Sequence, residues 1–166
     1  MSPLPSRVVL DNTVVSSLHE AGALPRVLCL WGSQWVVPLQ VRDEAAARKL
    51  HGAAARTILD QLESRGTIEY ASPDPATEGA LFVRLQRTRG QGESAAIAIA
   101  YMRGLVVATD DRRATKSCQG LRPPVVVLTT EAILTIAVDD GLLVASEAQA
   151  IWTATGIKDP NRGLGR

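Results

Sequence analysis

Residues 8–13 read Val8-Val9-Leu10-Asp11-Asn12-Thr13: three apolar residues and then an acid, an amide and a hydroxyl. A similar order recurs at residues 105–111, where LVVATDD also ends an apolar run on acidic residues. Apolar runs without polar alternation are typical of strands buried on both faces of a parallel sheet. Open α/β sheets bind ligands at the carboxyl ends of their strands, so carboxylates far apart in the sequence are expected to meet there.

Short apolar runs alternate with longer helical patterns along the chain, which predicts an α/β fold with helices covering a parallel sheet. The predicted strands are residues 7–10, 35–37, 67–71, 105–108 and 125–128. The predicted helices are residues 13–23, 39–50, 53–65, 76–89 and 93–102, with two more between residues 130 and 156. Gly66 and Gly104 are predicted to end helices, and Thr130 and Ser146 to cap the last two.

The composition describes an ordinary globular protein. Of the 166 residues, 46% are hydrophobic and 21% charged, and the formal net charge is +1. This composition argues against extensive disorder, and it lacks the basic excess common in nucleic-acid-binding proteins. We expect a single domain over residues 1–157 and a flexible C-terminal tail over residues 158–166.

The start of the chain lacks the features of a signal peptide, and no apolar run reaches the length of a membrane span. A cytoplasmic protein without membrane contacts is therefore expected. Cys29 and Cys118 have no metal-ligand spacing and are expected to be buried free thiols. The three tryptophans are expected mainly in the core.

Acidic side chains stand in four segments where a strand ends or a helix begins: Asp11, Glu44, Glu93, and the pair Asp110-Asp111. Each has an ordinary structural explanation too. Asp11 suits a helix N-cap, Glu44 suits a solvated helix surface, and Glu93 interacts favourably with a helix dipole. Carboxylates that converge repel one another unless they hold a cation, and Mg²⁺ or Mn²⁺ is the usual choice.

Four stretches follow one another in an order that resembles a known family: VVLDNT (residues 8–13), PLQVRDE (38–44), GQGESAA (90–96) and VATDDRRA (107–114). They resemble the motifs of PIN-domain ribonucleases, which include the VapC-type toxins of prokaryotic toxin–antitoxin pairs. The likeness comprises an opening strand with its first aspartate, a proline–valine–glutamate pattern, a glycine-flanked glutamate and a final threonine–aspartate motif. Residues 131–143 also resemble the C-terminal helices of one branch.

The resemblance implies a PIN-like α/β/α sandwich with a central parallel sheet of four to five strands. It implies metal-dependent endoribonuclease activity, in which RNA phosphodiester bonds are hydrolysed. Catalysis and the binding of Mg²⁺ or Mn²⁺ fall to four acids: Asp11, Glu44, Glu93 and Asp111. Asp110 would be a flanking ligand or a supporting group, and the hydroxyls of Thr13 and Thr109 would support the site.

The resemblance also implies partners: RNA, a cognate antitoxin protein and a second copy of the chain in a homodimer, as the toxin of a type II toxin–antitoxin pair. Five basic residues would contact RNA phosphates if they are not simply a solvated face: Arg84, Arg87, Arg112, Arg113 and Lys116.

The main alternative is a non-catalytic PIN-like scaffold that binds RNA or protein. A phosphoacceptor receiver domain is disfavoured, because Asp11-Asn12 stands where an acidic pair is required and Thr129-Thr130 where a lysine is required. A dinucleotide-binding enzyme is disfavoured since no glycine-rich turn follows the first strand.

Overall fold

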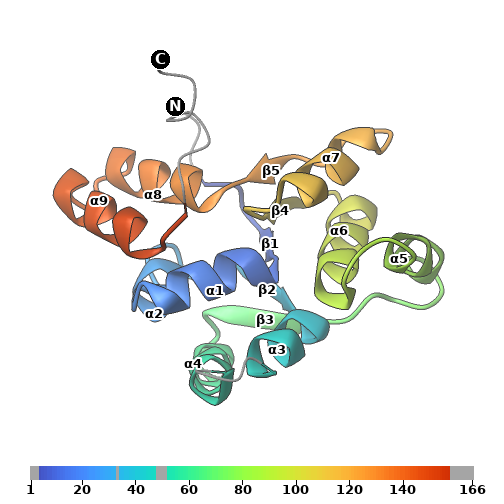
Figure 1. Cartoon of the computed structure of the whole chain (residues 1–166), viewed down its shortest axis with the longest axis horizontal. Coiled ribbons are helices and arrows are strands. Elements are labelled where there is room, and N and C mark those ends of the chain that lie inside the picture. Colours follow the sequence, from blue (N-terminus) through green and yellow to red (C-terminus); the bar gives the residue numbers. More distant parts are fainter. Residues whose placement is uncertain (1–3, 33, 48–51, 158–166) are drawn as a thin grey trace.

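A computed structural model describes residues 4–32, 34–47 and 52–157. Its centre is one parallel sheet in the order β3-β2-β1-β4-β5 (Figure 1). The strands are β1 (Val8–Leu10), β2 (Trp35–Pro38), β3 (Ile68–Ala71), β4 (Val106–Ala108) and β5 (Val127–Leu128). The predicted α/β fold and its parallel sheet are confirmed.

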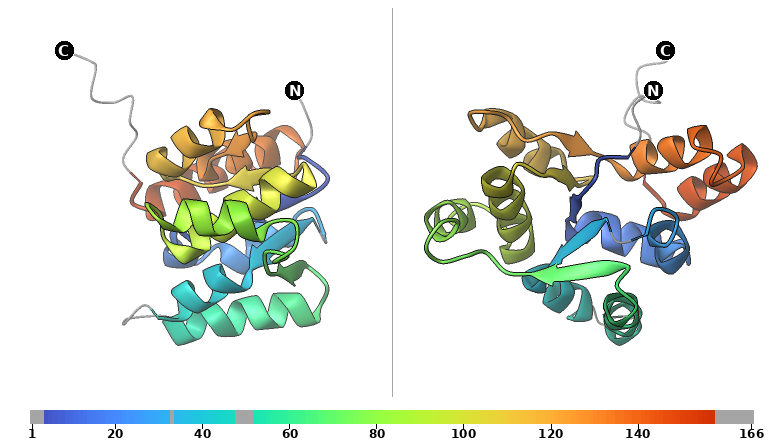
Figure 2. Two further views of the ribbon diagram at one scale, coloured as in Figure 1. Left: turned by 90° about the vertical axis from the view of Figure 1, so that its right-hand side faces the viewer. Right: turned by 180° about the vertical axis from the view of Figure 1, so that it is seen from behind.

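Helices lie on both faces of this sheet (Figures 1 and 2). They are α1 (Asn12–Glu20), α2 (Leu24–Leu28), α3 (Leu39–Ala46), α4 (Gly52–Ser64), α5 (Gly79–Gln86), α6 (Gln91–Arg103), α7 (Arg112–Gly120), α8 (Thr130–Asp139) and α9 (Ala145–Ala154). The arrangement is a PIN-like α/β/α sandwich.

Two hydrophobic cores result, because successive residues of β1 point to opposite faces. Val8 and Leu10 pack in the core that α1–α4, α8 and α9 cover, whereas Val9 packs in the core of α6 and α7. Helix α6 is apolar almost all round, and its residues 94–100 are fully buried. This burial fixes the helix that begins with Glu93.

Some predicted boundaries are wrong. The predicted helix over 13–23 ends at Glu20, with Gly22 at φ 67°, and α2 follows as a separate helix. Helix α5 begins only at Gly79, because residues 74–78 form a turn in which the Glu78 carboxylate accepts from Asp74 N–H at 2.7 Å. Helix α7 was not predicted.

The predicted N-caps are wrong as well. Thr129, not Thr130, caps α8 by accepting from Ala132 N–H at 3.1 Å, and α9 is preceded by Val144 without a side-chain cap. Gly66 and Gly104 have positive φ at the ends of α4 and α6, as predicted. The predicted end of a helix at residue 50 and the predicted tail lie outside the described residues.

Cys118 is buried as expected, but Cys29 is exposed because it follows the last turn of the short α2. Trp35 is fully buried, while Trp31 and Trp152 only pack against the core. Within the described ranges, no helix has the length and apolar character needed to cross a membrane.

The strand order brings the chain's acidic segments together. Strand β1 has β2 on one side and β4 on the other, so the chain changes direction across the sheet between β1 and β4. Asp11 follows β1 and Asp110 follows β4, and Asp11 N–H donates to Ala108 O at 2.9 Å. Such switch points are where open α/β sheets form ligand-binding crevices.

Candidate active site

Asp11 is the most buried of the candidate acids, with 3% of its surface exposed. It is the N-cap of α1, because its Oδ1 accepts from Asn12 N–H at 2.7 Å. Its Oδ2 accepts from the hydroxyls of Thr13 at 2.9 Å and Thr109 at 2.8 Å. Burial raises the pKa of Asp11 above its ordinary value, although these hydrogen bonds act in the opposite direction.

The two threonines bind β1 and β4 together at their carboxyl ends. Thr13 Oγ1 lies 3.2 Å from Thr109 Oγ1, and it accepts from Asp110 N–H at 3.0 Å. Thr109 Oγ1 accepts from Asp111 N–H at 3.1 Å. The predicted supporting hydroxyls therefore hold both the Asp11 carboxylate and the backbone of the Asp110-Asp111 pair.

The two neighbouring aspartates differ in their contacts. Both carboxylate oxygens of Asp110 accept hydrogen bonds from Thr130. The Thr130 N–H donates to Oδ1 at 2.8 Å, and the Thr130 hydroxyl donates to Oδ2 at 2.7 Å. Asp111 caps α7, but it uses only Oδ1, which accepts from Arg113 N–H at 2.6 Å. Asp110 thus anchors the start of α8, while Asp111 keeps one oxygen outside its capping bonds.

Glu44 reaches the start of α6 from α3. Its Oε1 accepts from Gly92 N–H at 2.7 Å. A Cβ atom at residue 92 would stand only 2.5 Å from Glu44 Oε2, so glycine is what permits this approach. The Glu44 carboxylate is thereby placed beside the residue that precedes Glu93.

Glu93 shares an ion pair with Arg89, which stands just before the N-cap of α6, and Arg89 Nε lies 3.2 Å from Glu93 Oε1. The Glu93 side chain is 16% exposed. Arg89 also donates to Ser117 Oγ at 2.6 Å, which ties this arginine to α7. Glu93 Oε1 is buried and accepts no hydrogen bond.

Burial raises the pKa of Glu93 to about 7. The Arg89 charge lowers this pKa, whereas the charges of Asp11 and Asp111 raise it further. Three acids from β1, α6 and the end of β4 therefore act on one another electrostatically. The Arg113 charge also lowers the pKa of Glu93, which places this arginine within range of the same acids.

A family model described as a PIN domain matches residues 7–155 of the chain. The chain belongs to the PIN-domain family. A search of curated proteins finds no match to it. PIN domains are in general nucleases, and the match covers every strand of the sheet and the whole acidic edge described above.

In this PIN domain Asp11 and Asp111 lie close enough to Glu93 to affect its pKa. Glu44 accepts a hydrogen bond from Gly92 N–H, the residue next to Glu93. Across residues 4–32, 34–47 and 52–157, no group of three or more histidine, cysteine, aspartate or glutamate side chains is already arranged to hold a metal ion. The basic residues proposed to contact RNA lie exposed on two helices: Arg84 on α5, Arg87 at its end, and Arg112, Arg113 and Lys116 on α7.

Sequence reasoning missed two residues of this PIN domain's acidic edge. Arg89 was not assigned to this edge, because it precedes α6 and its ion pair with Glu93 depends on the turn that leads into that helix. Thr130 was predicted to cap α8, whereas it binds Asp110. No local signal reveals that second contact, because it depends on the pairing of β4 with β5.

Replacing Gly92 with alanine should lower the activity of this PIN domain about tenfold or more, because the added Cβ displaces the Glu44 carboxylate. Stability should change little, since the Glu44 carboxylate can move, Val41 Cγ2 at 3.1 Å has to give by only a few tenths of an ångström, and alanine favours a helix. The measurement is nuclease activity beside thermal unfolding. Gly90→Ala is the matched control: its Cβ would lie 3.5 Å from Glu44 Oε1, an ordinary contact. Equal activity in the two variants would show that Glu44 has no role.

The raised pKa of Glu93 predicts a pH dependence of stability in the metal-free protein. Between its ordinary 4.5 and about 7, the folded chain retains this proton while the unfolded chain loses it. Stability should therefore fall as pH rises through that window. Glu93→Gln should remove the loss of stability that is due to Glu93. The measurement is the melting temperature of both proteins in EDTA from pH 4.5 to 7.5. Identical pH profiles in both proteins would contradict the raised pKa.

Proposed function

We propose that this protein is a metal-dependent endoribonuclease that hydrolyses RNA phosphodiester bonds. The observation that carries the proposal is that Thr109 joins the Asp11 carboxylate to the backbone of Asp111 at the switch point of a PIN-domain sheet. Asp11 is buried and Glu93 and Asp111 are partly buried, and a partly buried cluster of negative charge suits the binding of a cation.

The donor set fits a hard divalent cation. Every candidate ligand is a carboxylate oxygen, which is the type of ligand that Mg²⁺ and Mn²⁺ prefer. Glu93 Oε1 is buried without a hydrogen bond, and Asp111 keeps an oxygen outside its helix cap. We therefore assign the metal to four residues: Asp11, Glu44, Glu93 and Asp111.

A bound divalent cation lowers the pKa of water and offsets negative charge on the phosphate. The chain's own residues orient the site. Thr13 and Thr109 hold Asp11 in one orientation, and Gly92 does the same for Glu44. The exposed guanidinium of Arg113, which acts on Glu93 electrostatically, is placed to contact a phosphate of the substrate.

The narrower biological assignment rests on the resemblance to VapC-type toxins. We propose that the protein is the toxin of a type II toxin–antitoxin pair and that a cognate antitoxin inhibits it. Homodimerisation and a cytoplasmic location belong to the same proposal.

The test is cleavage of total cellular RNA by the purified protein with Mn²⁺, with Mg²⁺ or with EDTA. The proposal predicts discrete products with a divalent metal and none with EDTA. A folded protein that leaves RNA intact with every metal would contradict it. That result would favour the non-catalytic scaffold, in which the hydrogen bonds of Asp11 and Glu44 serve only the fold.

A further inference from the structure

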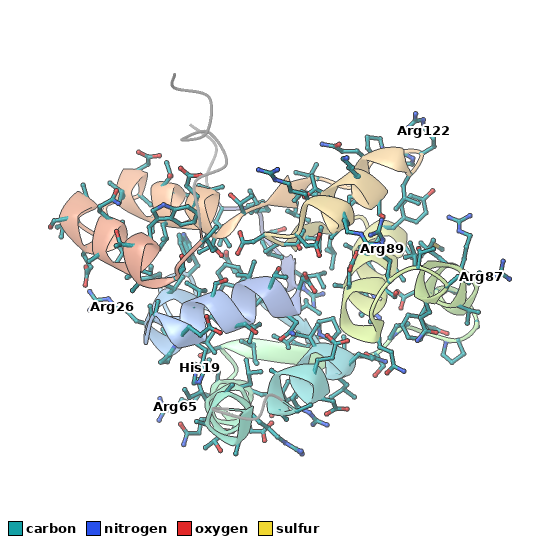
Figure 3. All side chains as sticks on the ribbon, in the orientation of Figure 1. His19, Arg26, Arg65, Arg87, Arg89 and Arg122 are labelled. Carbon is teal, nitrogen blue, oxygen red and sulfur yellow. The ribbon has the colours of Figure 1, made fainter. Side chains whose placement is uncertain are left out.

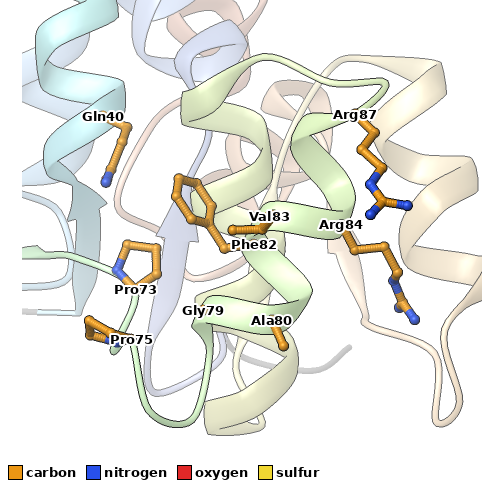
Figure 4. Close-up of a pocket in the computed structure, with 9 residues that line it drawn as sticks. All are labelled: Gln40, Pro73, Pro75, Gly79, Ala80, Phe82, Val83, Arg84 and Arg87. Atoms are coloured by element: carbon orange, nitrogen blue, oxygen red, sulfur yellow. The ribbon is translucent and has the colours of Figure 1, made fainter.

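A surface hollow of about 690 Å³ lies between α3, α5 and the loop that leads into α5 (Figure 4). Its walls include Gln40, Pro73, Pro75 and Phe82, and its rim includes Arg84 and Arg87. Phe82, Pro73 and Gln40 lie on one side of α5, while Arg84 and Arg87 extend from the other (Figure 4). The hollow thus combines an apolar floor with a cationic edge.

The apolar floor is unusual for this chain. Phe82 is the single phenylalanine of the sequence, and it is only half-buried. On the same helix Leu81 is buried and Leu85 packs into the core beside α6, so the core does not require Phe82. The neighbouring Val83 is 57% exposed. An accessible aromatic ring beside two rigid prolines is a surface on which a planar base can stack.

The polar groups of the hollow suit a nucleotide. Gln40 lines the hollow, and its Oε1 is closed to solvent without a hydrogen-bond partner among the described residues, so the carboxamide has to rotate to reach a ligand. A carboxamide offers both a donor and an acceptor to the edge of a base. The nearby acid Glu78 is neutralised by Arg103, whose Nε lies 2.7 Å from Glu78 Oε1. Arg84 and Arg87 are both exposed and favour an anion, and they outnumber the exposed Asp74 between the two prolines.

The hollow adjoins the acidic edge of the sheet. Gln40 stands four residues before Glu44 on α3, so their side chains share one face about one helical turn apart. Arg87, at the C-terminal end of α5, leads by six residues to Glu93. A chain that follows α3 from Gln40 would thus reach Glu44 within about one helical turn.

We propose that this hollow binds an unpaired nucleobase of single-stranded RNA, next to the phosphodiester bond that is cut. The base stacks on Phe82, the Gln40 carboxamide contacts its edge, and Arg84 and Arg87 bind the flanking phosphates. A base inside a duplex is stacked and paired, so it cannot enter. The inference rests on the proposed function and adds to it a subsite for one base, built from residues outside the acidic edge.

The first test measures binding of a fluorescent single-stranded oligoribonucleotide of about ten nucleotides in EDTA, by anisotropy, so that no cleavage occurs. Phe82→Leu should weaken binding about tenfold, and Phe82→Tyr, which keeps the ring, should not. A blunt RNA duplex of equal length should bind more weakly and show no dependence on residue 82. The proposal would be overturned if wild type and Phe82→Leu bound the single strand with equal affinity. It would also be overturned if Phe82→Leu weakened binding of the duplex as much as binding of the single strand.

The second test concerns the arginines. The double variant Arg84→Gln/Arg87→Gln should bind more weakly and reduce the slope of log affinity against log salt by about 1.4, the value for two phosphates of a single strand. Arg65→Gln is the control, since Arg65 lies far from Arg87 (Figure 3). If Arg65→Gln lost as much affinity as the double variant, the attraction would be non-specific. That result would overturn the assignment of Arg84 and Arg87 to phosphate binding.

The binding and cleavage results separate the two proposals. Binding that depends on Phe82, in a protein that cuts no RNA with any metal, would support the hollow and contradict the nuclease. Metal-dependent cleavage with the same kcat/KM in wild type and Phe82→Leu would support the nuclease and overturn the hollow. In the latter case the apolar floor is free to serve a protein partner instead.

Discussion

Replacing Asp11 with asparagine should lower metal-dependent RNA cleavage by about a thousandfold, the effect of removing several kcal/mol of charge stabilisation. Asp11 is the acid that the surrounding residues hold most firmly, with hydrogen bonds from Asn12, Thr13 and Thr109. Asparagine has nearly the same shape but lacks the negative charge. The measurement is kcat/KM on an oligoribonucleotide with saturating Mn²⁺.

The same substitution should leave the fold intact. Burial raises the pKa of Asp11, which means that its negative charge destabilises the metal-free fold. Asparagine carries no charge and removes this destabilisation. The hydroxyls of Thr13 and Thr109 can rotate to accept from an amide. We expect the variant in EDTA to melt at or above the temperature of the wild type. A variant that melts well below it would mean that Asp11 serves the fold first.

The neighbouring aspartates should respond in opposite ways to the same loss of charge. Asp111→Asn should lower cleavage about a hundredfold while α7 stays capped, because asparagine is as good an N-cap as aspartate. Asp110→Asn should change cleavage little, since an amide can still bind the N–H and the hydroxyl of Thr130. Both variants are compared by kcat/KM and by melting temperature.

Asp110→Ala completes this comparison. It leaves the buried Thr130 hydroxyl and N–H without their partner, which should cost about 1–3 kcal/mol of stability. The melting temperature should then fall by about 3–10 °C, while the folded fraction keeps its activity. An equal loss of cleavage in Asp110→Asn and Asp111→Asn would contradict the choice of Asp111 over Asp110 as a metal ligand.

The strands were predictable from the sequence because they are continuous apolar runs. Residues 8–10 and 106–108 have no polar alternation, and both faces of each strand are in fact covered by helices. Two helices could not be predicted in the same way. Helix α2 has five residues with Pro25 in its first turn, and α7 is polar along most of its length and depends on the Asp111 cap.

Asp11, Glu93 and the Asp110-Asp111 pair were predictable because they stand at the end of a strand or the start of a helix, whereas Glu44 is the sixth of the eight residues of α3. The hydrogen bonds that join them were not predictable, because they depend on which strands are neighbours. The contact of Thr13 with Thr109 requires β1 beside β4, and that of Asp110 with Thr130 requires β4 beside β5. Local patterns do not encode this order. The resemblance already separated Asp111 from Asp110, but the bonds that tie Asp110 to Thr130 emerged only from the structure.

The most direct test of the proposed metal centre is an anomalous difference map from crystals of the protein grown or soaked with Mn²⁺. Our account predicts a strong peak among the carboxylates of Asp11, Glu93 and Asp111, and its loss in crystals of Asp11→Asn. A well-ordered acidic edge without a peak at saturating Mn²⁺, or a peak only elsewhere on the chain, would contradict the assignment of these carboxylates to a metal.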